Sequence, residues 1–253
     1  MILAVDAGNT NIVAALMNNG NVINEYRYNT GKDKDFEYHK NHLERLVQNR
    51  TIDSVIISSV VPEINSRLDT VCVQLTGISP KFVSCDMATG LDIKYDNPQK
   101  LGADLICAAV GAVKKYGAPV IVMDIGTATT FSVINKNKEY LGGMIAPGPY
   151  TSMQALASMA SQLSETELEI TDNVIGTNTA ECIKIGTLTA HSAMLDGMLD
   201  RVIPTLDTAD VKLVATGGFA QKITSMCTHK IICDVHLIFT GLYELYKINY
   251  CLL

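Results

Sequence analysis

The opening stretch MILAVDAGNTNIVAAL, residues 1–16, places a polar turn between two apolar runs. The short, largely apolar runs 2–8 and 12–18 indicate two buried β-strands. Asp6, Gly8, Asn9 and Thr10 are crowded into the turn between them. A plain connection between buried strands needs no acid, amide and hydroxyl, so this turn is a candidate binding site.

The middle of the chain repeats this design in APVIVMDIGTATTFSVINKNKEYLGGMIAPG, residues 118–148. A shift of 118 positions lays residues 6–10, DAGNT, on residues 124–128, DIGTA. Both copies begin with a β-branched strand and continue into a second strand. The repeat predicts two halves of similar plan, joined near residues 116–119.

Paired turns of this kind suit phosphate binding. Glycine lets backbone N–H groups approach an anion closely, and asparagine or threonine adds side-chain donors. Two facing hairpins can then hold a polyphosphate in a cleft. Asp6 and Asp124 would repel phosphate, so each is expected to hold a cation or a metal-bound water. Either copy alone could be only a tight hairpin, but two copies in register favour binding.

The rest of the chain alternates strand-like and helical patterns, which predicts the α/β class. A third strand is expected over 22–29, an amphipathic helix over 35–50, and a strand followed by a helix over 54–75. His39 and His42 in the first helix could chelate a metal, but the amphipathic pattern favours an ordinary solvent-exposed helix surface. No other histidine arrangement indicates a catalytic triad.

A third glycine site lies in VKLVATGGFAQKI, residues 211–223, where a strand turns into a helix. Gly217 and Gly218 allow a nucleoside to lie against the backbone, or simply permit a tight turn. With two phosphate hairpins upstream, they become a candidate adenosine site. The sequence contains neither a P-loop motif nor a dinucleotide-binding glycine motif, which excludes those two folds.

Asp104 has an unusual setting in IKYDNPQKLGADLICAAVGAVKKYG, residues 93–117. It precedes an apolar helix and should lie in the first turn, where the helix dipole favours its ionised form. A carboxylate there could accept a proton from an alcohol that attacks phosphorus. The alternative is that Asp104 only stabilises the start of the helix.

Composition excludes several classes of function. The net charge is −6 with no Lys/Arg-rich run, so nucleic-acid binding is not expected and phosphate must be held mostly by backbone groups and a metal. No apolar run reaches about 18 residues and no signal peptide is evident, which predicts no membrane span and a cytoplasmic protein. Seven scattered cysteines without a Cys-x-x-Cys pair suit reduced thiols better than disulfides or zinc.

Taken together, the motifs resemble those of the type III pantothenate kinases, members of the acetate kinase, sugar kinase, Hsp70 and actin superfamily. They run in family order across nearly the whole chain. The motifs are Asp6-x-Gly8-Asn9-Thr10, Tyr95-x-x-Pro98, Gly102-Ala103-Asp104, Asp124-x-Gly126-Thr127-Ala128-Thr129-Thr130, Gly142-Gly143-x-Ile145-x-Pro147-Gly148, Ile175-Gly176-x-Asn178-Thr179 and Thr216-Gly217-Gly218.

The resemblance implies duplicated ribonuclease-H-like (actin-like ATPase) domains, 1–116 and 117–253, with a cleft between them. It also implies a homodimer built largely on a helical segment of about 150–203. The implied reaction transfers the γ-phosphoryl group of ATP to the terminal hydroxyl of pantothenate, the first step towards coenzyme A. Magnesium accompanies ATP, and potassium or ammonium is required.

Site residues follow from the resemblance and from the turns described above. Asp104 matches the general base, Asp124 a monovalent-cation ligand, and Asp6 would hold magnesium through water. ATP is expected at Asp6, Ala7, Gly8, Asn9, Thr10, Asn11, Ile12, Val13, Thr127, Gly217 and Gly218. Pantothenate is expected at Tyr95, Gly102, Ala103, Asp104, Leu105 and Thr179, with Thr179 near the partner's site.

One position departs from the family pattern, because Leu105 stands where the family has arginine after Gly-Ala-Asp. Leucine offers no donors to substrate or phosphate. Three functions therefore remain open: a pantothenate kinase with a compensating group such as Lys100, a kinase for another small alcohol, or a non-catalytic ATP-binding accessory protein. Retention of Asp6, Asp104 and Asp124 argues against the last.

Overall fold

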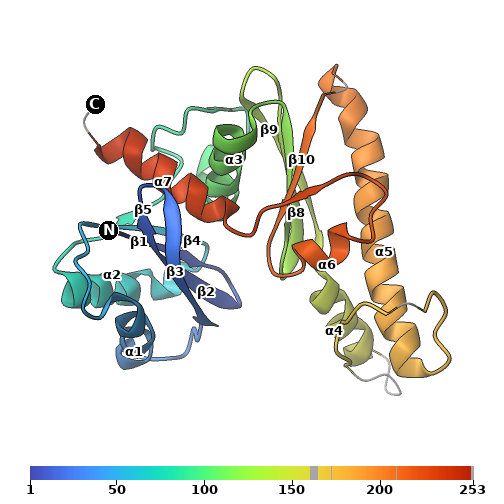
Figure 1. The fold of residues 1–253 in the computed structure, drawn as a ribbon, viewed down its shortest axis with the longest axis horizontal. Coiled ribbons are helices and arrows are strands. Elements are labelled where there is room, and N and C mark those ends of the chain that lie inside the picture. The colour runs from blue at the N-terminus through green and yellow to red at the C-terminus, as the bar shows by residue number, and fades with distance from the viewer. Residues whose placement is uncertain (160–164, 172, 209, 252–253) are drawn as a thin grey trace. The chain divides into compact units, whose positions relative to one another are not determined.

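The structure is a computed structural model that describes residues 1–159, 165–171, 173–208 and 210–251. It contains two units, each with its own sheet, and Figure 1 shows the elements of both. The first unit comprises Met1–Tyr116, Lys138–Tyr140 and the segment that begins at His236; the second comprises Gly117–Asn137 and Leu141–Val235.

The first unit contains a mixed five-stranded sheet in the order β3-β2-β1-β4-β5. Strand β1 pairs antiparallel with β2 and parallel with β4, and β3 pairs antiparallel with β2. The predicted hairpin is thus confirmed. The strands are β1 (Ile2–Ala7), β2 (Asn11–Asn18), β3 (Asn21–Asn29), β4 (Ser54–Ser59) and β5 (Lys81–Phe82).

Helices cover both faces of this sheet (Figure 1), which explains why Leu3, Ala4 and Val5 are all fully buried. Leu3 and Val5 pack in one core cluster with α1 (Phe36–Val47) and α2 (Pro62–Thr76). On the other face lie α3 (Ala103–Tyr116) and α7 (Leu237–Tyr250). The 3₁₀ turn η1 (Pro98–Lys100) precedes α3.

Two segments join the first unit although the sequence-based division at residue 116 placed them in the second half. Helix α7 packs closely on α3. The approach is close enough to require glycine at position 241, since a Cβ atom there would lie only 1.8 Å from the Cys107 carbonyl oxygen. The short strand β6 (Asp92–Ile93) pairs in parallel with Glu139 and Tyr140. Both contacts join residues far apart in sequence, so local patterns do not reveal them.

The second unit repeats the hairpin plan. Strand β7 (Val120–Ile125) pairs antiparallel with β8 (Ala128–Ile134) and parallel with β10 (Lys212–Thr216). This repeats the β2-β1-β4 arrangement, and it places Asp124 opposite Thr130 and Thr216 as Asp6 lies opposite Val13 and Ser58. The strand order in this unit is β11-β10-β7-β8-β9, completed by β9 (Glu139–Pro147) and β11 (Ile232–Cys233).

The helices of the second unit are α4 (Pro149–Met159), α5 (Thr179–Val202), the 3₁₀ turn η2 (Ile203–Leu206) and α6 (Ala220–Thr224). Leu195 and Leu199 of α5 pack against Ile121 and Met123 of β7. Residues 160–164 and 172 of the predicted helical segment lie outside the described residues, and 165–171 form no regular secondary structure. Among the described residues, the structure contains no helix long and apolar enough to cross a membrane.

His39 contradicts the expectation of a solvent-exposed helix surface at the start of α1. Its side chain is fully buried, with the rings of Tyr28 and Tyr38 centred 6.1 and 5.2 Å away. His42, one turn later, stacks on Tyr28 at 4.4 Å. The two histidines share the inward face with Leu43, so the aromatic residues of β3 and α1 make this face a core. Neither ring nitrogen of His39 has a hydrogen-bond partner among the described residues.

Acidification is expected to destabilise this core. Burial lowers the pKa of His39 below its ordinary 6.5, nearby Arg67 and His42 lower it further, and Asp35 opposes them. The unfolded chain therefore binds this proton first, and stability is lost as the pH falls below about 6.5. His39→Leu should reduce the slope of unfolding free energy against pH by up to about 1.4 kcal/mol per pH unit. Urea unfolding between pH 7.5 and 4.5 measures this; identical slopes for both proteins would contradict it.

Candidate functional site

The tip of the first hairpin presents two polar side chains to solvent. The Gly8 amide donates to the Asn11 carbonyl at 3.0 Å and closes the turn, while Asn9 and Thr10 are exposed. Ala7 and Ile12 are fully buried in the strands, so only their backbone groups can reach a ligand. The tip therefore offers the amide and hydroxyl groups that the sequence pointed to, on a rigid base.

The connection between β3 and α1 holds this tip in place through hydrogen bonds. The buried Thr30 donates its backbone N–H to the Thr10 carbonyl at 2.9 Å and its hydroxyl to the Gly8 carbonyl at 2.6 Å. The Lys32 ammonium donates to Asn9 Oδ1 at 2.8 Å. Sequence reasoning missed Thr30 and Lys32, because no local pattern links residues 30–32 to residues 8–10.

Asp6 is held from the neighbouring strand of the same sheet. Ser58, fully buried on β4, lies opposite Asp6 and donates its hydroxyl to Asp6 Oδ1 at 3.0 Å. The Cys107 thiol of α3 is buried close to both Asp6 and Asp104: burial raises its pKa well above the ordinary value, and the two carboxylates raise it further. Two of the predicted functional acids in the first unit thus lie within electrostatic reach of one buried thiol.

Asp104 lies in the first turn of α3, as the sequence predicted. Its Oδ1 accepts the Leu105 backbone N–H at 2.8 Å, and a Cβ atom on Gly102 would lie 2.4 Å from the same oxygen. Glycine at position 102 therefore leaves room for the carboxylate. Ala103 is buried and Leu105 is partly buried, while Tyr95 is exposed and meets the edge of the Tyr140 ring.

The pKa of Asp104 shifts in the direction opposite to the effect of the helix start. Burial raises the pKa of its carboxyl above the ordinary value, and the backbone N–H groups of Leu105 and Asp104 lower it by less. The helix start favours the charged form as expected, but loss of hydration outweighs it. A raised pKa strengthens the carboxylate as a base near neutral pH.

The second hairpin is braced by the start of α4. The Gly126 amide donates to the Ala128 carbonyl at 2.9 Å, and the Thr127 carbonyl accepts both the Gly148 amide at 3.0 Å and the Thr151 hydroxyl at 2.6 Å. A side chain at Gly148 would collide with the Gly126 carbonyl, 2.0 Å away. Thr127 is therefore held at a fixed turn.

The third glycine site meets this second hairpin. Gly217 has φ +95°, and a Cβ atom there would lie 2.3 Å from Asp124 Oδ1. The Phe219 amide donates to the Ile125 carbonyl at 3.0 Å. Asp124 and Gly217 are thus neighbours within the second unit, and Gly218 is exposed beside them.

A cavity of about 500 Å³ in the second unit begins at Phe219. Aromatic and acidic side chains form much of its wall, and Lys222 supplies a cation. The lining residues are Tyr150, Glu165, Thr166, Glu167, Leu168, Glu169, Phe219 and Lys222. The cavity is large enough for a nucleoside or a molecule of similar size.

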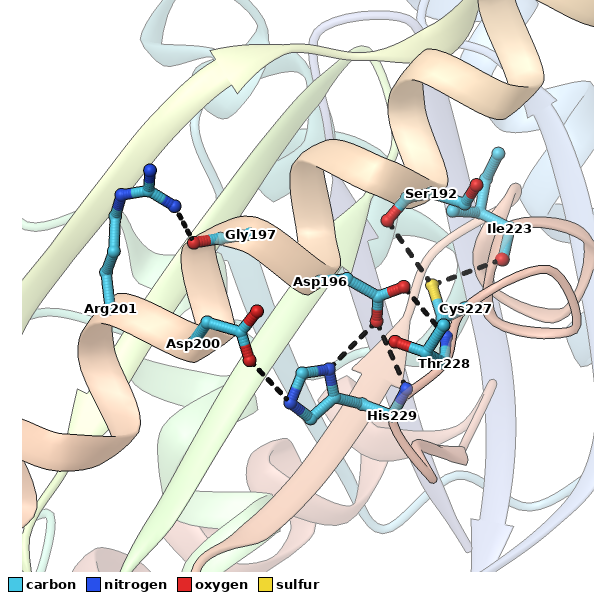
Figure 2. A network of polar contacts seen from close by, with 9 residues as sticks. All are labelled: Ser192, Asp196, Gly197, Asp200, Arg201, Ile223, Cys227, Thr228 and His229. Atoms are coloured by element: carbon cyan, nitrogen blue, oxygen red, sulfur yellow. Dashed lines mark hydrogen bonds and ion pairs between the residues drawn. The ribbon is translucent and has the colours of Figure 1, made fainter.

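Polar contacts join helix α5 to β8 and to the loop after α6. His191 and Thr129 are both buried and lie 2.8 Å apart, joining α5 to β8. Figure 2 shows a second connection, in which Asp196 accepts the backbone N–H groups of Thr228 and His229 and bonds the His229 ring. These contacts anchor the loop after α6, and their role is structural.

Thr179 begins α5, where Asn178 accepts the Glu181 backbone N–H at 3.0 Å. Glu181 in turn accepts the backbone N–H and hydroxyl of Thr177, so the capping residues explain where the helix begins. Thr179 is exposed.

No group of three or more His, Cys, Asp or Glu side chains within the described ranges could hold a metal ion. Asp6 offers a single carboxylate beside the Ser58 hydroxyl, and Asp124 offers one near the Ile125 carbonyl at Gly217. A single carboxylate suits magnesium that arrives with nucleotide phosphates better than a metal cage built by the protein. The seven cysteines are free thiols.

Comparison with solved structures defines the fold class first. The fold is similar to that of the activator of 2-hydroxyisocaproyl-CoA dehydratase from Clostridium difficile with bound ADPNP (TM-score 0.59, 14% identity, covering 98% of this chain and 94% of the other). It is also similar to a ROK family glucokinase from Streptomyces griseus in complex with glucose and AMPPNP (TM-score 0.53, 12% identity, 98% of each chain). The protein therefore has the duplicated fold of the actin-like ATPases and sugar kinases.

The sequence then defines the family. Residues 2–201 match the family model of type III pantothenate kinase. A type III pantothenate kinase from Geobacillus sp. (strain WCH70) is 37% identical over 254 aligned positions, covering 98% of each chain. One from Halalkalibacterium halodurans is 36% identical over 98% of this chain and all of its own length. The chain belongs to the type III pantothenate kinase family.

Proposed function

We propose that this protein phosphorylates pantothenate with ATP in the first step of coenzyme A biosynthesis, with Asp104 as the general base. Family membership over nearly the whole chain is the observation that carries the reaction. The setting of Asp104 supports its role, because its carboxylate is partly buried, anchored to α3 and shifted in pKa towards neutrality.

In this mechanism the terminal hydroxyl of pantothenate attacks the γ-phosphorus of ATP. A new oxygen–phosphorus bond forms, the bond to the bridging oxygen of ADP breaks, and the hydroxyl proton passes to the Asp104 carboxylate. Magnesium bound with ATP supplies charge neutralisation, and Asp6, oriented by Ser58, is the residue that would hold it through water. Tyr95, residues 102–105 and Thr179 are the proposed pantothenate contacts.

The proposed ATP site uses the two hairpins and the third glycine turn. Residues 6–13 and Thr127 would contact phosphates, and the fixed geometry of both turns supports this. Gly217 and Gly218 would contact the nucleoside, which the neighbouring cavity at Phe219 supports.

Asp124 is the proposed ligand for potassium or ammonium. Asp124→Asn should reduce the stimulation of ADP release by KCl several-fold, since an amide attracts a cation less than a carboxylate does. Asp210→Asn, at an exposed carboxylate paired with Lys212, is the matched control. The assay compares KCl with choline chloride at equal ionic strength. Potassium stimulation that is unchanged in Asp124→Asn would contradict the assignment.

A homodimer is proposed from apolar side chains that are exposed in the second unit. Met159 is 89%, Val174 83% and Ile175 80% exposed, all within the predicted dimerisation segment of about 150–203. A second copy of this chain would cover them.

The cytoplasm is the proposed location, and free thiols support a reducing compartment.

A further inference from the structure

The connection between β3 and α1 lies against the tip of the first hairpin. Thr30, buried to 1% exposure, bonds the carbonyl groups of Gly8 and Thr10. Gly31 follows with φ +54° and is buried. Arg67 of α2 donates to the carbonyl groups of Lys32 and Lys34, the former at 3.0 Å. The backbone of Lys32 is therefore fixed on both sides.

The Lys32 side chain is exposed, and its ammonium lies 2.8 Å from Asn9 Oδ1. Asn9 is neutral, so this contact leaves the positive charge uncompensated, and two of the three ammonium protons stay available. Lys34 differs, because its ammonium lies 3.5 Å from an oxygen of Asp33. One lysine of the segment is thus aimed at the hairpin tip while the other pairs with a carboxylate.

The same hydrogen bond orients the Asn9 amide. Its oxygen is occupied by Lys32, so its NH2 group faces away from the lysine with both protons available. An anion at the tip would meet the Asn9 amide and the Lys32 ammonium together. Charge-assisted hydrogen bonds are about twice as strong as neutral ones, so the ammonium would be the strongest of these donors.

We infer that Lys32 binds the phosphate groups of ATP at the tip of the first hairpin and holds the Asn9 amide towards the same phosphates. This inference rests on the proposed function, because the first hairpin must be the phosphate site. It also changes an expectation from the sequence, in which backbone groups and a metal carried most of the phosphate binding. Thr30 and Arg67 fix the backbone around Lys32, and its ammonium supplies a positive charge at the tip that the negative net charge of the chain does not reveal.

The test compares Lys32→Met and Lys32→Arg with Lys34→Met as the matched control. KM for ATP is measured with saturating pantothenate, and inorganic tripolyphosphate serves as an inhibitor that carries phosphate without a nucleoside. Lys32→Met should raise both the KM for ATP and the inhibition constant of tripolyphosphate about tenfold or more. Lys32→Arg should retain most of the binding, and Lys34→Met should match wild type.

Asn9→Ala separates this inference from the assignment of the hairpin. If Asn9→Ala weakens tripolyphosphate and ATP binding but Lys32→Met does not, the role of Lys32 is refuted and the hairpin remains a phosphate site. If neither variant changes binding, the hairpin assignment fails as well. Thermal unfolding of each variant confirms that the exposed substitutions leave the fold intact, and Lys32→Gln replaces Lys32→Met if that protein does not fold.

Discussion

Asp104→Asn is expected to lower kcat for pantothenate phosphorylation by about 100- to 10,000-fold. Asparagine has nearly the same shape and can keep the contact to the Leu105 backbone, but it cannot accept the hydroxyl proton. ATP binding should be unchanged, because the base does not contact the nucleotide in the proposed mechanism. Coupled ADP release measures turnover, and calorimetry measures the Kd for ATP.

Asp86→Asn, at an exposed carboxylate in the same unit, is the control and should match wild type. The pH dependence gives a second readout. Because burial raises the pKa of Asp104 and the deprotonated form is the base, kcat/KM is retained above that pKa and falls as the pH drops through it. The acid limb should therefore lie above the pKa of an ordinary aspartate. Full turnover in Asp104→Asn would show that the base lies elsewhere.

Leu105→Arg is expected to raise kcat/KM for pantothenate about tenfold or more. Position 105 is the second residue after the buried Ala103 at the start of α3 and directly follows the proposed base, where an arginine would provide a planar fork of donors. Loss of a charged partner in a binding site typically costs about 2–5 kcal/mol, so its restoration should be measurable. The assay is pantothenate-dependent ADP release over a range of pantothenate concentrations.

Leu105→Met is the matched control, since methionine is apolar and adds no donor. Lys100→Met tests whether this neighbouring cation compensates for the missing arginine, in which case its activity should fall and Leu105→Arg should restore it. If Leu105→Arg gains nothing with pantothenate while wild type turns over another small alcohol, the acceptor is different. If neither pantothenate nor another small alcohol is phosphorylated, an accessory ATP-binding role would be favoured.

The hairpins and the place of Asp104 could be predicted because both depend on local patterns. Apolar strands around a short polar turn define β1-β2 and β7-β8, and the apolar helix after Gly102 places Asp104 in a first turn. The internal repeat also predicted that Asp6 and Asp124 occupy equivalent places, and each lies on the first strand of its hairpin.

The supporting contacts could not be predicted, because they join residues far apart in sequence. Ser58 bonds Asp6 because their strands pair in register. Gly217 lies next to Asp124 because β10 pairs with β7. Lys32 bonds Asn9 because Thr30 holds the connection before α1 against the hairpin tip. The wrong expectation at His39 and the unexpected pKa shift at Asp104 have one cause. Amphipathic patterns and helix dipoles are local, whereas burial is set by packing, and burial decided both environments.

Direct detection of the product tests whether this protein phosphorylates pantothenate. Wild-type protein is incubated with ATP, magnesium, potassium and millimolar pantothenate, and 4′-phosphopantothenate is measured by ³¹P NMR beside ADP. We expect the phosphorylated product and ADP to appear in equal amounts, and only when pantothenate is present. ATP that binds but yields no phosphorylated pantothenate, with ADP release indifferent to pantothenate, would contradict it.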